Sequence, residues 1–541
     1  MSGMVKTELA NVNKCDSARM KTLIEGPFSN SRQCTREEIE HIKTWLKYHQ
    51  NDMIQHVLDA KCNPFNVKAY HLLIDMLTDS GTHRTWQKQA EFLRMWEMLF
   101  KDCETFAYAG SPARELLNET ISRIFGEQFY FHLTVQGRAA EFLLLNGLQA
   151  NGLMPKGSVV LTNHGFDTTC GHIKAVGCKV IACSPVTTPQ RVASMPDSVF
   201  FGNLSISELR KQLDSNEGNV SAVLLTLTDN GGGGQPVSMA NIKAVTKEAH
   251  DRGIPLWIDG CRIAENAAYI KAYEPGYSDR SLQDIIAETM SECEFSTTSF
   301  KKIYSHSGGG IFLNKDSPLL QAKMGAVRKS VMELTTVVYG MGFETGYCGR
   351  TGRDMVEIVS GLLYAMDPEN VANRIGQVRE VSDTLAGHGF PHVAGGNALY
   401  TASEQVLSNV PLEYAPAEYL QAIMLAATGV RGCALGNRLY GEWRQNGHGW
   451  ELVRPSEMDS LRAAVMRLGN STPMLILGLE PMAIAHEQGY LKPLTQGLEV
   501  IDYETSGFNH FKAIYEVRDV VEFKKAVGLV NEIFNESARN L

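Results

Sequence analysis

The stretch AVLLTLTDN at residues 222–230 is a short apolar run that ends in polar residues, and two runs of the same kind follow it. These are IPLWID at residues 254–259 and FSTTSF at residues 295–300. A polar-patterned helical stretch, SMANIKAVTKEAHDRG at residues 238–253, separates the first two runs. Almost continuously apolar strands that alternate with helices are typical of a parallel sheet covered on both faces. We therefore expect an α/β fold in which ligands bind at the carboxyl ends of these strands.

The rest of the chain supports this fold class and indicates a second domain. SVVLT, KVIAC and GGIFLN are further strand candidates, and Thr35-Arg36-Glu37-Glu38 has the form of a capping box that begins a helix. After about residue 360, helical stretches such as VANRIGQVREVSDTLAGHG alternate with short strand candidates and glycine-rich turns. We expect an N-terminal arm or extension over residues 1–62, a large α/β domain over residues 63–360, and a small α+β domain over residues 361–541.

Composition places the chain among ordinary globular proteins. It has 541 residues, a formal net charge of −9, 44% hydrophobic residues and 21% charged residues, and at this length two domains are expected. The modest negative charge argues against a nucleic-acid partner. No run reaches the roughly 18 apolar residues of a membrane span, and the N-terminus lacks the apolar core of a secretory signal. The 11 cysteines form no C-x-x-C pair, so we expect a reducing, cytoplasmic setting and no structural zinc.

Asp259 and Lys302 mark the chemistry that these strand ends favour. Asp259 closes one apolar run, Arg262 follows three residues later, and Lys302 follows another run. A lysine that forms a Schiff base and an acid beside a pyridinium nitrogen are what a protein uses to hold pyridoxal 5′-phosphate (PLP). The carboxylate keeps the ring nitrogen protonated, because an opposite charge nearby stabilises the charged form. Arg262 lies close enough in sequence to reach the ring oxygen of the same cofactor.

Each of these residues also has a plainer interpretation. An aspartate after a strand is more often a helix N-cap or a surface acid. A lysine is more often a solvated surface residue, and Lys301 is a rival for the Schiff-base role. The PLP interpretation is favoured because Asp259, Arg262 and Lys302 occur together. Ser299 and the Ser307–Gly310 run support it further, because they indicate tight backbone near a phosphate.

Two upstream segments complete the predicted cofactor site. Gln136, Gly137 and Arg138 precede an apolar helical pattern, and a glycine with a basic residue at a helix start is a natural anion site. We place the cofactor phosphate there, although an ordinary turn before a helix has the same sequence. Phe166 lies in the segment NHGFDTTCGH, where a planar ring is placed to stack on the pyridine. The plainer alternative for Phe166 is a core phenylalanine.

Taken together, these segments resemble the PLP-dependent beta-eliminating lyases, the family of tryptophanase and tyrosine phenol-lyase. The resemblance is colinear from about Pro64 to Ala513. It implies a PLP-dependent transferase-like fold of type I, and a homodimer or homotetramer that acts on a small amino-acid substrate. The matching segments are LIDMLTDSGT, AYAGS, QGRAAE, FDTTCGH, GGQPVSMAN, DGCR, AENAAYIK and SFKK.

The resemblance also implies roles for individual residues. Lys302 matches the cofactor lysine, Asp259 the pyridinium partner and Arg262 the residue at the ring oxygen. Asn230 and Arg462 match the amide and the arginine that bind the substrate carboxylate. The whole implied cofactor-binding set is Gln136, Gly137, Arg138, Phe166, Asn230, Asp259, Arg262, Ser299 and Lys302.

Positions around the substrate favour an apolar leaving group. Asp167 and His510 resemble residues of tryptophanase, and with Tyr108, which matches a tyrosine lent across a subunit interface, they form the implied set of proton donors. Where tyrosine phenol-lyases carry an arginine for the phenol oxygen, this chain has Leu435. Phe106 replaces an acidic ligand of the family's activating potassium ion, so a cation requirement is left open and no metal ligands are predicted.

The predicted activity is beta-elimination from an L-amino acid, in which Lys302 removes the alpha proton and the products are pyruvate and ammonium. Tryptophan, which releases indole, is the first candidate substrate. Three other PLP reactions on the same scaffold are alternatives, namely cysteine-conjugate C–S cleavage, beta-substitution, and a threonine-aldolase-like cleavage, for which DGCRIAENAA gives a similar pattern. A non-catalytic binding protein that keeps the fold is the alternative from another class.

Overall fold

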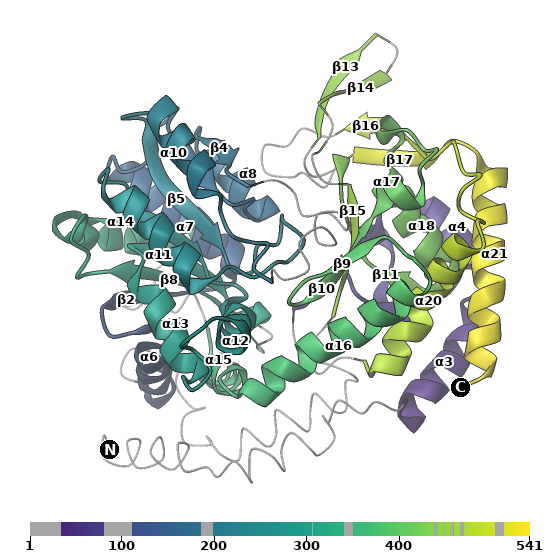
Figure 1. Ribbon diagram of the computed structural model, residues 1–541, viewed down its shortest axis with the longest axis horizontal. Coiled ribbons are helices and arrows are strands. Elements are labelled where there is room, and N and C mark those ends of the chain that lie inside the picture. The colour runs from purple at the N-terminus through teal and green to yellow at the C-terminus, as the bar shows by residue number, and fades with distance from the viewer. Residues whose placement is uncertain are drawn as a thin grey trace.

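The computed structural model forms two lobes (Figure 1). One lobe is built around a seven-stranded sheet and the other around a four-stranded sheet. Helix α16 (Pro368–Gly387) runs between the lobes in the view of Figure 1. The residues that the structure describes are 34–80, 111–184, 199–303, 305, 307–339, 350–437, 441–447, 449–454, 456, 459–465, 470–503 and 513–541.

The seven-stranded sheet contains all six strands that the sequence predicts for it. The spatial order is β2 (Phe129–Thr134), β8 (Gly309–Asn314), β7 (Phe295–Ser299), β6 (Leu256–Asp259), β5 (Val220–Thr226), β3 (Val159–Thr162) and β4 (Lys179–Ala182). The five strands from β7 to β4 in this order are parallel, and β8 runs antiparallel to both of its neighbours, so the prediction of a mostly parallel sheet is confirmed.

Two strands of this sheet differ from what the sequence predicts. Strand β2 is missing from the prediction because His132 interrupts its apolar pattern, yet the structure buries that imidazole and pairs it with Thr335 Oγ1 at 2.8 Å. Strand β4 is predicted as a buried strand, but Lys179 and Ala182 are exposed. The reason is that β4 is the edge of the sheet and pairs only with β3.

Hydrophobic clusters cover both faces of the sheet. Neighbouring strand residues enter opposite clusters, with Val159 and Leu161 in one and Val160 in the other, as the twofold period of a strand requires. The helices around the first cluster are α6 (Pro112–Phe125), α10 (Ile206–Ser215), α11 (Met239–His250), α12 (Ile263–Tyr273), α13 (Leu282–Ser291) and α15 (Gly352–Ala365). Those around the second are α7 (Gly137–Ala150), α8 (Asp167–Ala175) and α14 (Gln321–Tyr339).

The second lobe has an antiparallel sheet and a helical layer. Its four strands, in spatial order, are β12 (Cys433–Leu435), β15 (Ser460–Ala464), β10 (Ala398–Ala402) and β9 (His392–Ala394). Its helices besides α16 are α17 (Ser403–Val406), α18 (Pro416–Thr428), α20 (Thr472–Glu487) and α21 (Val520–Arg539). Smaller pairs are β13 (Glu442–Asn446) with β14 (Gly449–Arg454), β16 (Leu498–Tyr503) with β17 (Ala513–Val517), and β1 (Ile74–Asp75) with β11 (Val430–Arg431).

The described N-terminal residues pack into the core of the second lobe. Helices α3 (Arg36–Tyr48) and α4 (Met53–Asp59) contribute side chains such as Trp45 to the same cluster as α18 and α21. Gly429 follows α18 with φ +69°, and a Cβ there would lie 2.3 Å from the Trp45 ring, so the contact needs glycine. The domain limits at about residues 62 and 360 stay a prediction, and residues 1–33 lie outside the described residues.

Glu38 fixes the start of α3. The predicted capping box is confirmed, because Glu38 N donates to Thr35 Oγ1 and Thr35 N donates to Glu38 Oε2. The same carboxylate accepts hydrogen bonds from Ser471 N and Ser471 Oγ, each at 2.8 Å. Glu38 therefore joins the first described helix to the N-cap residue of α20.

Three broader features bear on the class of protein. Within the described residues, no helix has the length and apolar character needed to cross a membrane. None of the eight cysteines in that part of the chain forms a disulfide with another of them. The same residues contain no group of three or more histidine, cysteine, aspartate or glutamate side chains arranged to hold a metal ion.

Replacing Glu38 with alanine is expected to lower the free energy of unfolding by about 1–3 kcal/mol, because Ser471 N and Thr35 N lose their acceptor in a buried place. The measurement is chemical unfolding of the purified protein. The control is Glu40→Ala on the same helix. Its carboxylate pairs with Lys43 at the exposed surface, so this change should alter stability by less than about 0.5 kcal/mol. Equal stabilities for the two variants would contradict this account.

Candidate active site

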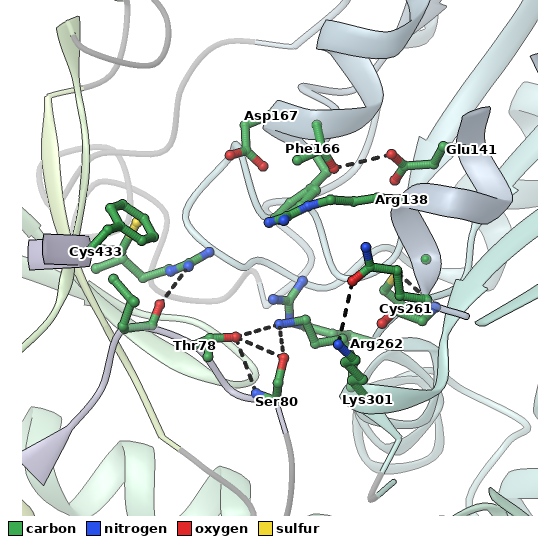
Figure 2. Close-up of a pocket in the computed structure, with 18 residues that line it drawn as sticks. Thr78, Ser80, Arg138, Glu141, Phe166, Asp167, Cys261, Arg262, Lys301 and Cys433 are labelled. Carbon is green, nitrogen blue, oxygen red and sulfur yellow. Dashed lines mark hydrogen bonds between the residues drawn. The ribbon is translucent and has the colours of Figure 1, made fainter. Parts of the chain in front are cut away.

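A cavity of about 320 Å³ lies where residues of both lobes meet (Figure 2). In Figure 2, Cys433 and Thr78 lie on one side of it and Arg138 and Cys261 on the other. Nine of the predicted site residues line this cavity, namely Gln136, Gly137, Arg138, Phe166, Asp167, Arg262, Ser299, Lys302 and Arg462. Asn230, Asp259 and Leu435 are not among its lining residues, and Tyr108 and His510 lie outside the described residues.

Lys302 lies in a single 3₁₀ turn, Phe300–Lys302, directly after β7. Its Nζ donates to three oxygens, Thr78 Oγ1 at 2.7 Å, Asp79 Oδ1 at 2.8 Å and Ser80 Oγ at 2.9 Å. Burial lowers the pKa of Lys302 to about 8, although the neighbouring Asp79 carboxylate acts in the opposite direction. A lysine with such a pKa is in part the neutral amine near pH 8, which is the form that attacks carbonyls.

Asp79 is the main contact of Lys302, and sequence reasoning gives it no role. Although burial favours its neutral form, the charges of Arg262, Lys302 and Arg374 hold the pKa of Asp79 well below its usual range. The segment LTDS does carry a signal, since three polar residues follow an apolar run there. Besides Lys302, the donors to this carboxylate are Arg262 Nε at 2.8 Å and Nη2 at 3.1 Å, Arg374 Nη2 at 2.9 Å, and Asn397 Nδ2 at 3.0 Å.

Asp259 ends β6 and is 2% exposed. Its Oδ1 accepts a hydrogen bond from Cys261 N at 3.1 Å. Burial, assisted by the negative charge of Glu141, raises the pKa of Asp259 to about 6. A buried acid in this state gains from a cation beside it, and a protonated pyridine nitrogen supplies one.

The start of α7 forms a cationic end of the cavity. The N-cap residue Gln136 leaves the first backbone N–H groups of the helix without a side-chain cap, and a Cβ on Gly137 would lie 2.8 Å from Ser299 Cβ. This close approach needs glycine. Burial, and then the charges of Arg350 and Arg138, lower the pKa of Lys301. Clustered cations at a helix N-terminus are a site for a phosphate dianion, as predicted for this end.

Phe166 and Asp167 begin α8 on the sheet lobe. The Arg262 guanidinium lies 6.0 Å from the centroid of the Phe166 ring, so an aromatic face and a cation approach the same space. Asp167 is 8% exposed, and its Oδ1 is buried without a hydrogen-bond partner within the described residues. An acceptor in this state is available to a proton donor that enters the cavity.

Arg462 and Asn230 lie together at another part of the site. Arg462, on β15, donates from Nη1 to Asn230 Oδ1 and from Nη2 to Leu77 O, both at 3.1 Å. Tyr400 also donates to Asn230 Oδ1, at 3.0 Å. Arg462 Nε and Asn230 Nδ2 are buried donors with no acceptor among the described residues. Two such donors fit a carboxylate, which accepts several hydrogen bonds.

Cys433, rather than Leu435, faces the cavity from β12. Leu435 is 1% exposed and packs with Val393 and Tyr400 in a small hydrophobic cluster. Phe65 and Leu77 also line the cavity, and the sequence prediction did not include them. The apolar character expected at Leu435 is therefore supplied by other residues.

The residues present fit PLP. A cationic helix start suits its phosphate, a buried acid with a raised pKa suits its ring nitrogen, and a buried lysine with a lowered pKa suits its aldehyde. Between the two lysines, Lys302 is the one whose Nζ is buried beside Asp79, whereas Lys301 is half-buried with its Nζ 3.5 Å from Gln136 Oε1, at the cationic end.

Solved structures share the fold. An aromatic aminotransferase from Pyrococcus horikoshii has a TM-score of 0.51 at 12% identity, and the match covers 79% of this chain and 98% of that one. Bna3p, a putative kynurenine aminotransferase from Saccharomyces cerevisiae, has a TM-score of 0.52 at 13% identity and covers 82% and 98%. At these identities the likeness concerns the fold alone, and it confirms the predicted type I architecture of PLP enzymes.

Sequence comparisons reach further. The family model for beta-eliminating lyases matches residues 75–432. A tryptophanase from Hyphomonas neptunium is 31% identical over 506 residues, which cover 92% of this chain and 100% of that protein. A probable beta-eliminating lyase from Trichomonas vaginalis is 32% identical, covering 76% of this chain and 83% of its own length. Because the family model matches more than half of the chain and a relative of 31% identity covers most of it, this chain belongs to the beta-eliminating lyase family and is a PLP-dependent lyase.

Proposed function

We propose that the protein catalyses beta-elimination of an L-amino acid with an apolar leaving group, and that tryptophan is the first candidate. The observation that carries this proposal is the content of one cavity, in which Lys302 and the Arg462 guanidinium lie beside an apolar wall of Phe65, Leu77 and Cys433. The relatives named tryptophanase support the same choice. The products would be pyruvate, ammonium and the leaving group.

The proposed roles follow from the chemistry of each side chain. PLP, when bound, supplies an electron sink that makes the alpha proton of the substrate acidic. Arg462 and Asn230 bind the substrate carboxylate with their free donors, and Lys302 Nζ takes the alpha proton. When PLP is bound, the Asp259 carboxylate would keep the pyridine nitrogen of the cofactor protonated. Asp167 serves the leaving group together with Tyr108 and His510, two residues that lie outside the described part of the chain.

Three other PLP reactions would use the same lysine, and the substrate screen below tests them together with beta-elimination. Threonine-aldolase-like cleavage would give glycine and an aldehyde, whereas C–S lyase activity would give pyruvate from a cysteine conjugate, and beta-substitution would give a new amino acid. The apolar wall favours a bulky apolar side chain over that of threonine. A non-catalytic role has no support, because the chain belongs to a lyase family and keeps Lys302 in the cavity.

The wider setting is proposed in the same way. We infer a homodimer or homotetramer in the cytoplasm, with an N-terminal arm and domains divided near residues 62 and 360. A requirement for potassium is left open, because Phe106, which replaces the family's acidic ligand, lies outside the described residues.

Incubation of the protein and PLP with tryptophan, serine, cysteine or a cysteine conjugate should give pyruvate, with indole from tryptophan. Threonine is tested beside them, and its beta-elimination would give 2-oxobutyrate. Lys302→Ala should lower turnover by at least ~10²–10⁴-fold, because the base is lost. Lys301→Ala should keep turnover at saturating PLP but need more PLP to reach it. Glycine and an aldehyde from threonine, without pyruvate from any substrate, would favour the aldolase reaction and contradict the proposal.

Replacing Arg462 with alanine should raise the KM for the amino acid about 10–100-fold, which corresponds to a charge-assisted hydrogen bond of about 1.5–3 kcal/mol. Steady-state kinetics over a range of substrate concentrations measure this. Arg444→Ala, on the exposed β13–β14 hairpin, is the matched control and should leave KM unchanged. A KM for Arg462→Ala equal to that of the wild type would refute the carboxylate role.

Asp259→Asn should stabilise the cofactor-free protein at pH 8 but not at pH 4. The pKa of Asp259 is raised to about 6 in the folded protein, so ionisation of this carboxyl opposes folding from the unfolded-state pKa of about 3.9 upward and does so fully above about 6, whereas most of this penalty is absent at pH 4. The gain at pH 8 should approach about 3 kcal/mol, from about two pKa units at 1.36 kcal/mol each. Unfolding curves at pH 8 and pH 4 measure this difference in stability. A variant that is less stable than the wild type at both pH values would contradict the raised pKa of Asp259.

A further inference from the structure

We infer that Thr78, Asp79 and Ser80 form a receiving site that holds the ammonium of Lys302 in the cofactor-free protein and after this side chain has taken the alpha proton. We call these three residues the receiving loop. They are positioning residues, since they act through Lys302. The inference deepens the proposed function and rests on it only in assigning the cofactor to Lys302.

The geometry of the receiving loop matches an ammonium group. A lysine ammonium has three N–H donors and no acceptor. Lys302 Nζ meets three oxygens of the loop at 2.7, 2.8 and 2.9 Å, so each donor has its own acceptor. One of the three acceptors is a carboxylate, and hydrogen bonds between charged groups are about twice as strong as neutral ones.

The receiving loop stays satisfied when Lys302 leaves it. Asp79 keeps four hydrogen bonds from Arg262, Arg374 and Asn397. The hydroxyls of Thr78 and Ser80 lie 2.9 Å apart and bond each other, and Ser80 N donates to Thr78 Oγ1 at 3.3 Å. A buried carboxylate that lost its only partner would be costly, but this one has partners in both states. The loop therefore keeps its structure whether or not Lys302 is bound to it, and Lys302 can move between the loop and the cofactor.

The charges around Lys302 make such a site necessary. Burial and the positive charges of Arg262 and Arg462 disfavour the ammonium, and Asp79 is the group that favours it. These charged side chains come from four different parts of the fold: Asp79 follows β1, Arg262 precedes α12, Arg462 is on β15, and Arg374, the other cation on Asp79, is on α16. Without the receiving loop, a displaced Lys302 would lie near the cations Arg262 and Arg462 and would have no anion in hydrogen-bond contact among the residues that the structure describes.

The loop also connects the two lobes at the reacting lysine. Leu73 and Ile74, just before it, belong to the core of the second lobe, whereas Lys302 follows a strand of the large sheet. Asp79 is thus held from both sides, by Arg374 of α16 and by Arg262 at the start of α12. The receiving loop places the free lysine at the junction of the lobes, beside the cavity.

The test measures the acid–base midpoint of Lys302 in the cofactor-free protein. Limited acetylation with acetic anhydride at a series of pH values, followed by peptide mass spectrometry, gives the reactivity of individual lysines. Asp79→Asn should shift the midpoint of Lys302 down by about one pH unit or more, because the anion is lost. Lys301, on the same segment of chain, is the internal control, and its midpoint should stay unchanged.

A second variant covers the case in which Asp79→Asn does not fold. Thr78→Val combined with Ser80→Ala removes two acceptors of Lys302 and keeps the pairs of Asp79 with Arg262 and Arg374. Its Lys302 midpoint should also fall, by less than that of Asp79→Asn, with the unfolding temperature close to that of the wild type. An unchanged Lys302 midpoint in every variant that folds would overturn the inference.

The outcome is separable from that of the proposed function. The acetylation experiment uses neither substrate nor turnover. If the amino-acid screen gives no pyruvate but the Lys302 midpoint shifts as stated, the proposed reaction is refuted and the role of the receiving loop is supported. If pyruvate forms and the midpoint does not shift, the loop is refuted and the reaction stands.

Discussion

The buried carboxylate of Asp79 is the constraint on which the cavity depends. Removing an ion from water costs several kcal/mol unless partners replace the solvent. Here the partners are Arg262, Lys302, Arg374 and the amide of Asn397. They come from both lobes, so the carboxylate is fully paired only when the lobes meet. The same contact orients Arg262 and Lys302, two residues that the cofactor chemistry needs.

The rest of the cavity divides according to charge. The start of α7, with Arg138 and Lys301, provides the cationic end, while Arg462 and Asn230 provide donors without acceptors in the described residues. Phe65, Leu77 and Cys433, which also line the cavity, provide an apolar wall. A ligand with a phosphate, a carboxylate and an apolar group matches this distribution, and PLP together with an amino acid is such a pair.

The sequence predicts the sheet well because buried parallel strands have a continuous apolar pattern. It misses β2, where a buried histidine breaks that pattern, and it treats β4 as buried although pairing on one side exposes it. Lys302, Arg262 and Arg462 are predictable from spacing and family resemblance. Asp79 is not, because its importance arises from four partners distant in sequence. Cys433 and Leu435 share one face of β12, because they are two residues apart, and the sequence does not show that the cavity lies at the Cys433 end of the strand.

The central claim is that Lys302 carries PLP in this lyase. The most direct measurement is reduction of the PLP-loaded protein with borohydride, followed by peptide mass spectrometry to locate the pyridoxyl group. The account predicts one pyridoxyl group per chain, on Lys302. A pyridoxyl group on Lys301 instead, or a protein that takes up no PLP, would contradict it.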